Sequence, residues 1–209
     1  LNNAGTLRHI GGTLTVLAPV AINNTGSWDF ESGTLVANNT VNGAFNWTNG
    51  SMTGAGTTTL TGTVNLGLAG VASSPVVSGG RVLQLNSGAT FRGDGLFLSG
   101  GTLNVAAGQL FSSIGKRTAA NTVVSDNDIN NGTFNNAGTF LQDSGSRLVA
   151  GVPVLNETRV SSIFNNSGTV SVSTGRLYFS NDGTNTGTLA TAVGSELQFF
   201  TSGGFDISS

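Results

Sequence analysis

The stretch that decides the fold begins at residue 130 and reads Asn130-Asn131-Gly132-Thr133-Phe134-Asn135-Asn136-Ala137-Gly138-Thr139-Phe140. Twice within it, an Asn pair leads to a Gly, a Thr and a large apolar residue. Asn and Gly both tolerate positive φ, so each Asn/Gly step can turn the backbone at low cost. The Thr and the apolar residue favour an extended strand, with one side chain inward and the next outward. Residues 130–149 therefore predict three short turn-and-strand units.

The same unit recurs through the whole chain. A Gly-Thr pair followed by an apolar residue begins at Gly5, Gly12, Gly33, Gly62, Gly101, Gly132, Gly138, Gly168 and Gly187. Pairs of Asn begin at residues 2, 23, 38, 130, 135 and 165. The first two Asn pairs are 21 residues apart, whereas the units at residues 138 and 168 are 30 apart. A period of about 20–30 residues indicates a repeat architecture.

The composition supports an ordered chain with an uncharged surface. Of the 209 residues, 32 are Gly and only 9% are charged, whereas an average soluble protein has about 25% charged residues. Such a composition could also indicate a disordered linker. The 37% hydrophobic content and the 12 Phe argue for a folded chain, because the apolar residues are regularly spaced.

Charge and hydropathy exclude several classes of function. The net charge is −2 and the single Lys is Lys116, so the chain cannot neutralise a row of phosphates and we expect no nucleic-acid partner. The absence of Cys excludes disulfides and thiolate chemistry. The longest apolar run, residues 16–22, contains Pro19 and is far shorter than the roughly twenty residues of a membrane-spanning helix. Because the chain begins at Leu1 in mid-repeat, we expect a mature or excised piece of a longer protein.

The apolar residues follow the period of strands, and no stretch has a convincing helical period. The pattern predicts strands at residues 13–17, 27–30, 34–37, 57–60, 63–66, 81–85, 90–92, 96–98, 102–105, 109–111, 122–125, 133–134, 139–142, 147–149, 160–164, 169–173, 176–180, 188–191 and 196–201. It predicts loops at residues 68–80, 116–120 and 151–158.

A sandwich, a barrel and a β-solenoid all fit short strands with Gly and Asn turns. The fixed short period and the strand length favour the solenoid, in which Asn side chains of neighbouring coils could form a hydrogen-bonded ladder. We therefore predict that residues 1–209 form a single all-β segment, a parallel β-helix (β-solenoid) with roughly 20–30 residues per coil. About nine coils spaced about 4.8 Å apart would give a rod of roughly 40 Å.

The strand pattern also predicts which side chains face the core. The inward positions are Phe134, Phe140, Phe164, Leu177, Phe179 and Leu197. The directions of Leu177 and Phe179 could be reversed with that of Tyr178, because these three residues are consecutive and all apolar or aromatic.

The chain resembles the β-strand repeats of large bacterial surface proteins, which include filamentous-haemagglutinin-like adhesins and autotransporter passenger domains. The Asn-Asn-x-Gly-Thr-apolar units and the segment Phe45-Asn46-Trp47-Thr48-Asn49-Gly50-Ser51-Met52-Thr53-Gly54-Ala55-Gly56 carry the resemblance. It covers most of the chain as a style of repeat. It implies a right-handed parallel β-helix, secretion, and a stalk or adhesive role, and it names no ligand.

One segment is similar to the start of a calcium loop: Asp126-Asn127-Asp128-Ile129-Asn130-Asn131-Gly132. In the calcium loop, Gly occupies position six and Glu position twelve. Here the Gly stands at position seven, and Ala137 occupies the place of the Glu. Two interpretations of this segment, which contains Asp126 and Asp128, therefore remain open: a calcium loop and a solvated polar turn. We expect no metal site.

The candidate catalytic groups are few. Asp29 and Glu31 share a strand face, and Asp126 and Asp128 do so if extended; paired carboxylates could cleave a glycosidic bond, but ordinary surface residues explain them equally well. His9 is the single His and precedes two Gly, which gives a Ser-His-Asp triad little support. We expect no catalytic residue, no cofactor and no enzymatic activity.

Two short matches complete the set. Arg92-Gly93-Asp94 spells a tripeptide known for integrin recognition, a match that arises often by chance. Thr57-Thr58-Thr59 is the only dense Thr run, which is weak support for an ice- or surface-binding solenoid.

The leading hypothesis is a non-catalytic, secreted structural or adhesive β-solenoid, acting as a surface adhesin stalk or an extracellular fibre subunit. The alternative is a carbohydrate-binding or polysaccharide-cleaving β-helix. The expected partners are copies of the chain associating end to end, or further repeats of the same chain, and surface glycans are also open. The expected location is extracellular or at the cell surface.

Overall fold

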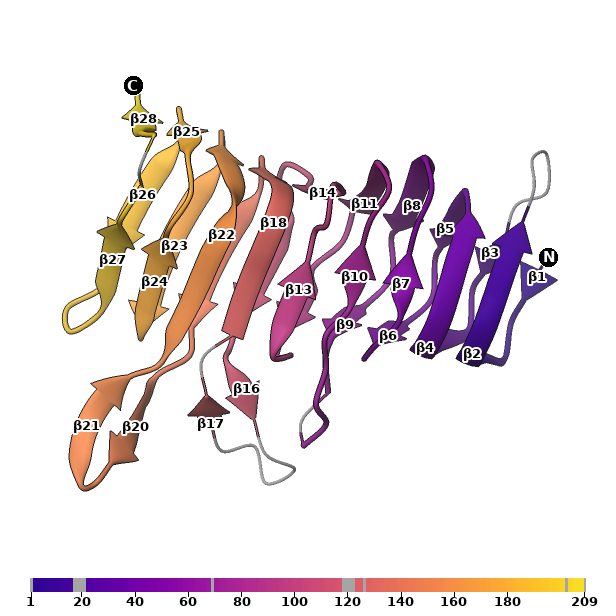
Figure 1. Cartoon of the computed structure of the whole chain (residues 1–209), viewed down its shortest axis with the longest axis horizontal. Coiled ribbons are helices and arrows are strands. Elements are labelled where there is room, and N and C mark those ends of the chain that lie inside the picture. Colours follow the sequence, from indigo (N-terminus) through magenta and orange to yellow (C-terminus); the bar gives the residue numbers. More distant parts are fainter. Residues whose placement is uncertain are drawn as a thin grey trace.

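The structure of the protein is a computed structural model, and residues 2–16, 22–68, 70–117, 123–125, 127–201 and 203–208 are described. These residues form short strands that lie side by side along one axis, from the N-terminus at one end to the C-terminus at the other (Figure 1). Within the described ranges there is no helix that could cross a membrane.

Each coil of the chain contributes a strand to three parallel columns. The first column contains β1 (Asn2–Asn3), β3 (Asn23–Asn24), β5 (Asn39–Val41), β8 (Gly56–Leu60), β11 (Arg81–Leu85), β14 (Thr102–Val105), the second halves of β18 (Asn127–Asn136) and β22 (Glu157–Asn166), β25 (Gly183–Asn185) and β28 (Phe205–Ile207).

The second and third columns are built in the same way. The second contains the first halves of β2 (Thr6–Val16) and β4 (Ser27–Ala37), then β6 (Phe45–Trp47), β9 (Val64–Leu66), β12 (Ala89–Phe91), β15 (Leu110–Ser113), β19 (Thr139–Asp143), β23 (Thr169–Thr174) and β26 (Thr188–Thr191). The third contains the second halves of β2 and β4, then β7 (Ser51–Met52), β10 (Val76–Val77), β13 (Gly95–Phe97), the first halves of β18 and β22, β24 (Arg176–Phe179) and β27 (Glu196–Phe199).

The register of the first column counts the coils. One line of paired residues runs from the first coil to the last: Asn3, Asn24, Val41, Leu60, Leu85, Val105, Asn136, Asn166, Asn185 and Ile207. About nine parallel coils therefore stack, and the predicted all-β solenoid is confirmed. Hydrogen-bonded side chains in successive coils are as few as 17 and as many as 31 residues apart, a wider range than the predicted 20–30.

The two longest coils carry hairpins at the same corner, between the second and third columns. These antiparallel hairpins are β16 (Lys116–Arg117) with β17 (Val123–Ser125), and β20 (Ser146–Val149) with β21 (Val152–Leu155). Both project from the same side of the rod (Figure 1). They account for the spacings of 31 and 30 residues between Asn104, Asn135 and Asn165.

The loop predicted at residues 151–158 is wrong, because Val152–Leu155 is a strand and Glu157 already belongs to β22. Ala150 and Gly151 both have positive φ, 50° and 81°, which is the geometry of a two-residue hairpin turn. Pro153 suggested a loop, but β21 pairs only with β20, and an edge strand tolerates Pro. Of the other two predicted loops, 68–80 contains the short β10, and 116–120 begins with β16 and otherwise lies outside the described residues.

Glycines recur at the corner between the first and second columns, and they are required there for a different reason from the one that the sequence suggested. A Cβ atom at Gly168 would overlap the carbonyl oxygen of Gly138, and one at Gly187 would overlap that of Gly168. None of these three residues is among those with positive φ. Glycine is therefore required here because each coil approaches the backbone of the previous one, and not because the corner needs a left-handed residue.

The Asn-Gly step at residues 131–132 does not end a strand, as the predicted turn-and-strand units required. It is a bulge inside β18, where the register with β22 shifts between Asn130 and Thr133. Asn131 and Gly132 have φ of 61° and 51°, and their extra length bends the strand from the third column into the first. The long strand therefore begins at Asn127, well before the predicted strand at residues 133–134.

The core is a continuous apolar stack inside the three columns. Phe134, Phe140, Phe164, Leu177 and Phe179 are fully buried, so five of the six predicted core positions are confirmed. Leu197, the sixth, also faces inward as predicted, in register with Leu177 and packed against the core, but it is only partly buried because it belongs to β27 in the last complete coil. Aromatic rings continue from coil to coil, for example from Phe134 to Phe164 at 5.1 Å between ring centroids and from Phe164 to Phe179 at 4.6 Å.

Candidate functional site

A ladder of side-chain amides runs along the outer face of the first column. Asn104 donates from Nδ2 to Oε1 of Gln84 at 3.2 Å, and Asn135 donates in the same way to Asn104 at 2.9 Å. Asn165 donates to Asn135 at 2.9 Å, and the Thr184 hydroxyl donates to Asn165 at 3.0 Å. Five successive coils are therefore linked outside the backbone, and the predicted Asn ladder is confirmed.

This ladder forms one wall of a groove of about 370 Å³. The opposite wall is the line of small residues that follows the corner, Ala106, Ala137, Ser167 and Thr186. The floor between the walls contains Val105, Asn136 and Asn166. None of the described residues that line the groove is charged, so its surface offers amides, hydroxyls and methyl groups.

The floor is held by a second ladder of buried amides. Asn136 donates to Asn166 at 2.7 Å, and Asn166 donates to Asn185 at 2.6 Å, with all three side chains at most 2% exposed. Each amide also donates to the carbonyl of the Gly two residues further on. The pairs Asn135-Asn136 and Asn165-Asn166 thus have two roles, because the first Asn of each faces the groove and the second fixes the corner beneath it.

The sequence predicted the paired Asn residues of this site but not its remaining members. Gln84 and Asn104 lie in the same line as Asn135 and Asn165. Neither of them belongs to an Asn pair, and only the parallel register aligns them. An alignment of the repeats that allowed for the hairpins would have placed Gln84 and Asn104 in the same line as Asn135 and Asn165.

Asp29 and Glu31 line a second cavity, of about 410 Å³, together with Asn46, Thr48 and two apolar residues of the following loop, Leu68 and Val71. Both carboxylates already have partners. Asn46 donates to Asp29 at 2.8 Å, and Arg8 donates to Glu31 at 2.7 Å. The hydrogen bond with Glu31 raises the pKa of the Arg8 guanidinium. The structure thus brings the predicted pair to one cavity, with each carboxylate held by a different neighbour.

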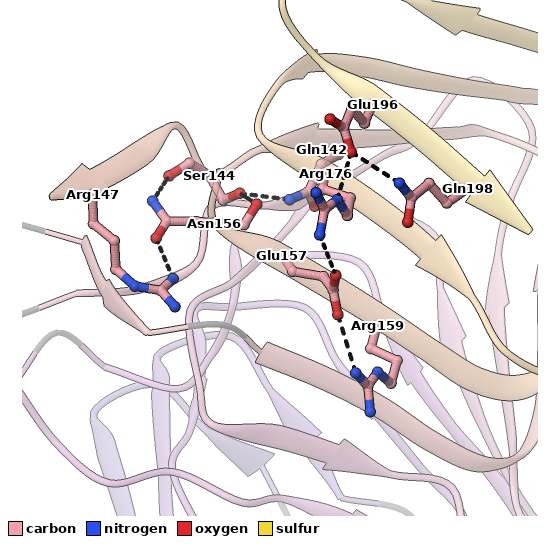
Figure 2. Close-up of polar contacts among 9 residues, drawn as sticks. All are labelled: Gln142, Ser144, Arg147, Asn156, Glu157, Arg159, Arg176, Glu196 and Gln198. Carbon is pink, nitrogen blue, oxygen red and sulfur yellow. Dashed lines mark hydrogen bonds and ion pairs between the residues drawn. The ribbon is translucent and has the colours of Figure 1, made fainter. Parts of the chain in front are cut away.

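A network of charged residues crosses the third column (Figure 2). Arg176 donates to Glu196 at 2.7 Å and to Glu157 at 3.4 Å, so that a cation stands between carboxylates of the two adjacent coils. The hydrogen bond to Glu196 is the main cause of a raised pKa of Arg176. Arg159 also pairs with Glu157, at 3.3 Å, and lies over the ring of Tyr178 at 5.3 Å.

A second, separate set of hydrogen bonds joins the β20–β21 hairpin to the rod (Figure 2). Asn156 donates to the backbone carbonyl of Ser144 at 2.8 Å, and Arg147 donates to the side-chain oxygen of Asn156 at 2.6 Å. The Ser144 hydroxyl donates to the backbone of Asn156 and accepts from Gln142. The hairpin therefore leaves the coil from a fixed, buried base.

Arg81 is buried in the first column with only neutral partners. Its side chain is 1% exposed and donates to the Thr58 hydroxyl at 2.8 Å and to Asn39 at 3.5 Å. Among the described residues no carboxylate pairs with it, and its Nε atom has no hydrogen-bond partner. Burial lowers the pKa of Arg81, because the charged form loses its hydration.

The calcium interpretation of residues 126–132 finds no support in the described part of the segment. Asp126 lies outside the described residues. Asn127 and Asp128 begin strand β18, so the segment is extended from there and forms neither a calcium loop nor the solvated turn considered as its alternative. In the described ranges no group of three His, Cys, Asp or Glu side chains could hold a metal ion.

The remaining short matches have structural positions. Asp94 of Arg92-Gly93-Asp94 accepts a hydrogen bond from the backbone N–H of Ser73 at 2.9 Å, so the tripeptide is not an exposed loop tip. The ring of His9 stacks on Phe30 at 4.8 Å and is only 8% exposed. Thr58 is fully buried, so the Thr57-Thr58-Thr59 run cannot present a flat row of hydroxyls.

Comparison of the chain with protein-family models, with curated proteins and with solved structures finds no significant match.

Proposed function

We propose that the chain is a non-catalytic, structural and adhesive β-solenoid segment of a secreted protein, working as a stalk or fibre element at a cell surface. The observation that carries this proposal is the unbroken line of paired residues from Asn3 to Ile207. Such stacking couples each coil only to its neighbours and makes a quasi-one-dimensional rod. The outer and buried amide ladders add side-chain links between coils, which favours stiffness along the axis.

The partner in this proposal is another coil of the same kind, from a further repeat or from a second copy. The inward side of the last coil is apolar and uncovered, with Phe199 38% and Ile207 63% exposed. The rings of Phe199 and Phe205 lie 4.7 Å apart there. Open strand edges and an apolar core face at one end favour end-to-end stacking.

Sedimentation velocity over a range of concentrations tests this association. Phe199→Lys and Phe205→Lys place a charge on the uncovered core face, and we expect both to reduce the concentration-dependent association. Phe200→Lys is the matched control, because Phe200 is 75% exposed and lies outward against Tyr178. A wild-type monomer at all concentrations, or equal effects of the three variants, would rule out stacking through this face.

Secretion is tested by protease treatment of intact cells that make the full-length protein with an epitope tag in the exposed β20–β21 hairpin. We expect loss of the tag from intact cells. Protection of the tag until the cells are lysed would contradict an extracellular location.

The Asp29 and Glu31 cavity is the observation that favours the alternative, polysaccharide cleavage. A reducing-end assay on neutral and acidic polysaccharides tests it. We expect no turnover. Turnover that is lost in both Asp29→Asn and Glu31→Gln, with folding intact by circular dichroism, would establish an enzyme and overturn the non-catalytic proposal.

A further inference from the structure

From the uncharged groove beside the amide ladder we infer a binding site for a neutral, linear polysaccharide lying along the rod axis. This assignment rests on the proposed adhesive function and names the chemical class that the rod would bind. The ladder residues Gln84, Asn104, Asn135 and Asn165 form one wall of the groove.

The ladder leaves hydrogen-bonding capacity unused in a regular order. A side-chain amide has two N–H donors and an oxygen with two lone pairs. Stacking uses one donor and one lone pair of Asn135, since Asn135 donates to Asn104 and accepts from Asn165. The same holds for Asn104, between Gln84 and Asn135. A donor and an acceptor therefore remain on each of these amides, repeated about every 4.8 Å along the axis.

The amides are held before any ligand arrives. Their orientation is set by the neighbouring coils, and the floor beneath them is fixed by the buried Asn136 and Asn166. Immobilised side chains lose little further conformational entropy on binding. The small opposite wall, from Ala106 to Ser167, leaves the groove open at the surface.

The lining decides between classes of ligand. The residues that line the groove carry no charge, so the site offers nothing to pair with the carboxylates or sulfates of an acidic polysaccharide. They include no aromatic ring and only small apolar groups, which gives an apolar peptide side chain no pocket to fill. Paired donors and acceptors at regular intervals match hydroxyl groups, which donate and accept at once. A neutral chain of sugars supplies these groups in a line.

Affinity electrophoresis in native gels containing a neutral β-glucan, galactomannan or dextran, or acidic polygalacturonate, tests the inference. We expect at least one neutral polymer to retard the protein, and polygalacturonate not to. Asn135→Leu and Asn165→Leu should weaken this retardation about tenfold or more, because each leaves a ligand hydroxyl without a partner. Ala137→Arg should do the same by filling the groove at an exposed position that takes no part in the ladder.

Asn65→Leu is the matched control. Asn65 donates to Asn46 at 2.9 Å in a similar ladder on the second column, so its replacement removes a ladder hydrogen bond between coils without touching the groove. Retardation by none of the neutral polymers, by polygalacturonate alone, or to the same extent in the groove and control variants would overturn the inference. Failure here leaves coil stacking and end-to-end association, which are measured by sedimentation, unaffected.

Discussion

At the scale of single residues, the stability of the rod depends on rings that stack from one coil to the next. Phe140 lies between Phe111, at 5.5 Å, and Phe164, at 6.0 Å, and is fully buried. Each such ring therefore belongs to the core of its own coil and to the contact with two others.

We expect Phe134→Ala and Phe140→Ala each to lower the free energy of unfolding by roughly 3–5 kcal/mol, since each leaves a cavity in a closed core. Phe200→Ala is the control, because its ring is 75% exposed and surface changes usually cost less than about 0.5 kcal/mol. Denaturant unfolding followed by circular dichroism measures both effects. A loss below about 1 kcal/mol at both core sites would show that the inward face is assigned wrongly.

Arg81 is the residue whose burial is hardest to reconcile with its charge. Its side chain lies beside Gly56, and a Cβ atom added at residue 56 would be 3.3 Å from Nη1 of Arg81. Its partners Thr58 and Asn39 already bond to each other at 2.8 Å.

We expect Arg81→Met to leave the free energy of unfolding unchanged or to raise it by about 1–2 kcal/mol, because removing an unpaired buried charge relieves its desolvation cost. Arg159→Met, at an exposed ion pair, should change it by less than about 1 kcal/mol. Thermal unfolding of the two variants beside the wild type gives the comparison. A loss of more than about 2 kcal/mol in Arg81→Met would mean that the guanidinium has a stabilising partner.

At the scale of the element, the corner after the first column exists in two versions. In the middle coils its inward position is apolar, at Val41, Leu60, Leu85 and Val105. In the first two coils it is Asn, and it is Asn again in the three coils that contain Asn136, Asn166 and Asn185. The change at Val105 leaves the Oδ1 atom of Asn136 without a partner. We therefore expect the buried ladder to be cooperative, because each Asn supports the next.

We expect Asn166→Val to cost roughly 1–3 kcal/mol, since it leaves the Oδ1 atom of Asn185 buried without its donor. Replacing Asn136, Asn166 and Asn185 together by Val should cost less than three times as much, because the apolar version of the corner already stands in the middle coils. Chemical unfolding of the single and triple variants measures the coupling between them. Strictly additive losses would contradict a cooperative ladder.

The sequence predicted many of the strands, the inward Phe positions and the Asn ladder because these follow from local periodicity. It could not place the amide groove, since Gln84 and Asn104 join Asn135 and Asn165 only through a register that skips two hairpins. The loop predicted at residues 151–158 was wrong because the single Pro was given more weight than the strand preference of the valines beside it. The role of the corner glycines was missed for a similar reason, because a contact between coils leaves no local pattern.

At the scale of the whole molecule, the central claim is that distance along the rod grows with the number of coils and not with the number of residues. The three columns add one strand per coil whether the coil has a hairpin or not (Figure 1). The axial length of the rod therefore depends on the number of coils, whose spacing is set by backbone hydrogen bonds. The additional residues of a long coil extend sideways instead of along the axis.

Nitroxide distances measured by electron–electron double resonance test this claim most directly, since the chain has no Cys to compete for labels. The outward line that contains the amide ladder supplies the label pairs Thr59/Asn165, Thr40/Thr184 and Asn23/Asp206, which are four, six and eight coils apart. At about 4.8 Å per coil we predict mean distances of about 19, 29 and 38 Å. Distances that follow sequence separation, or that do not increase from the first pair to the third, would contradict the stacked solenoid.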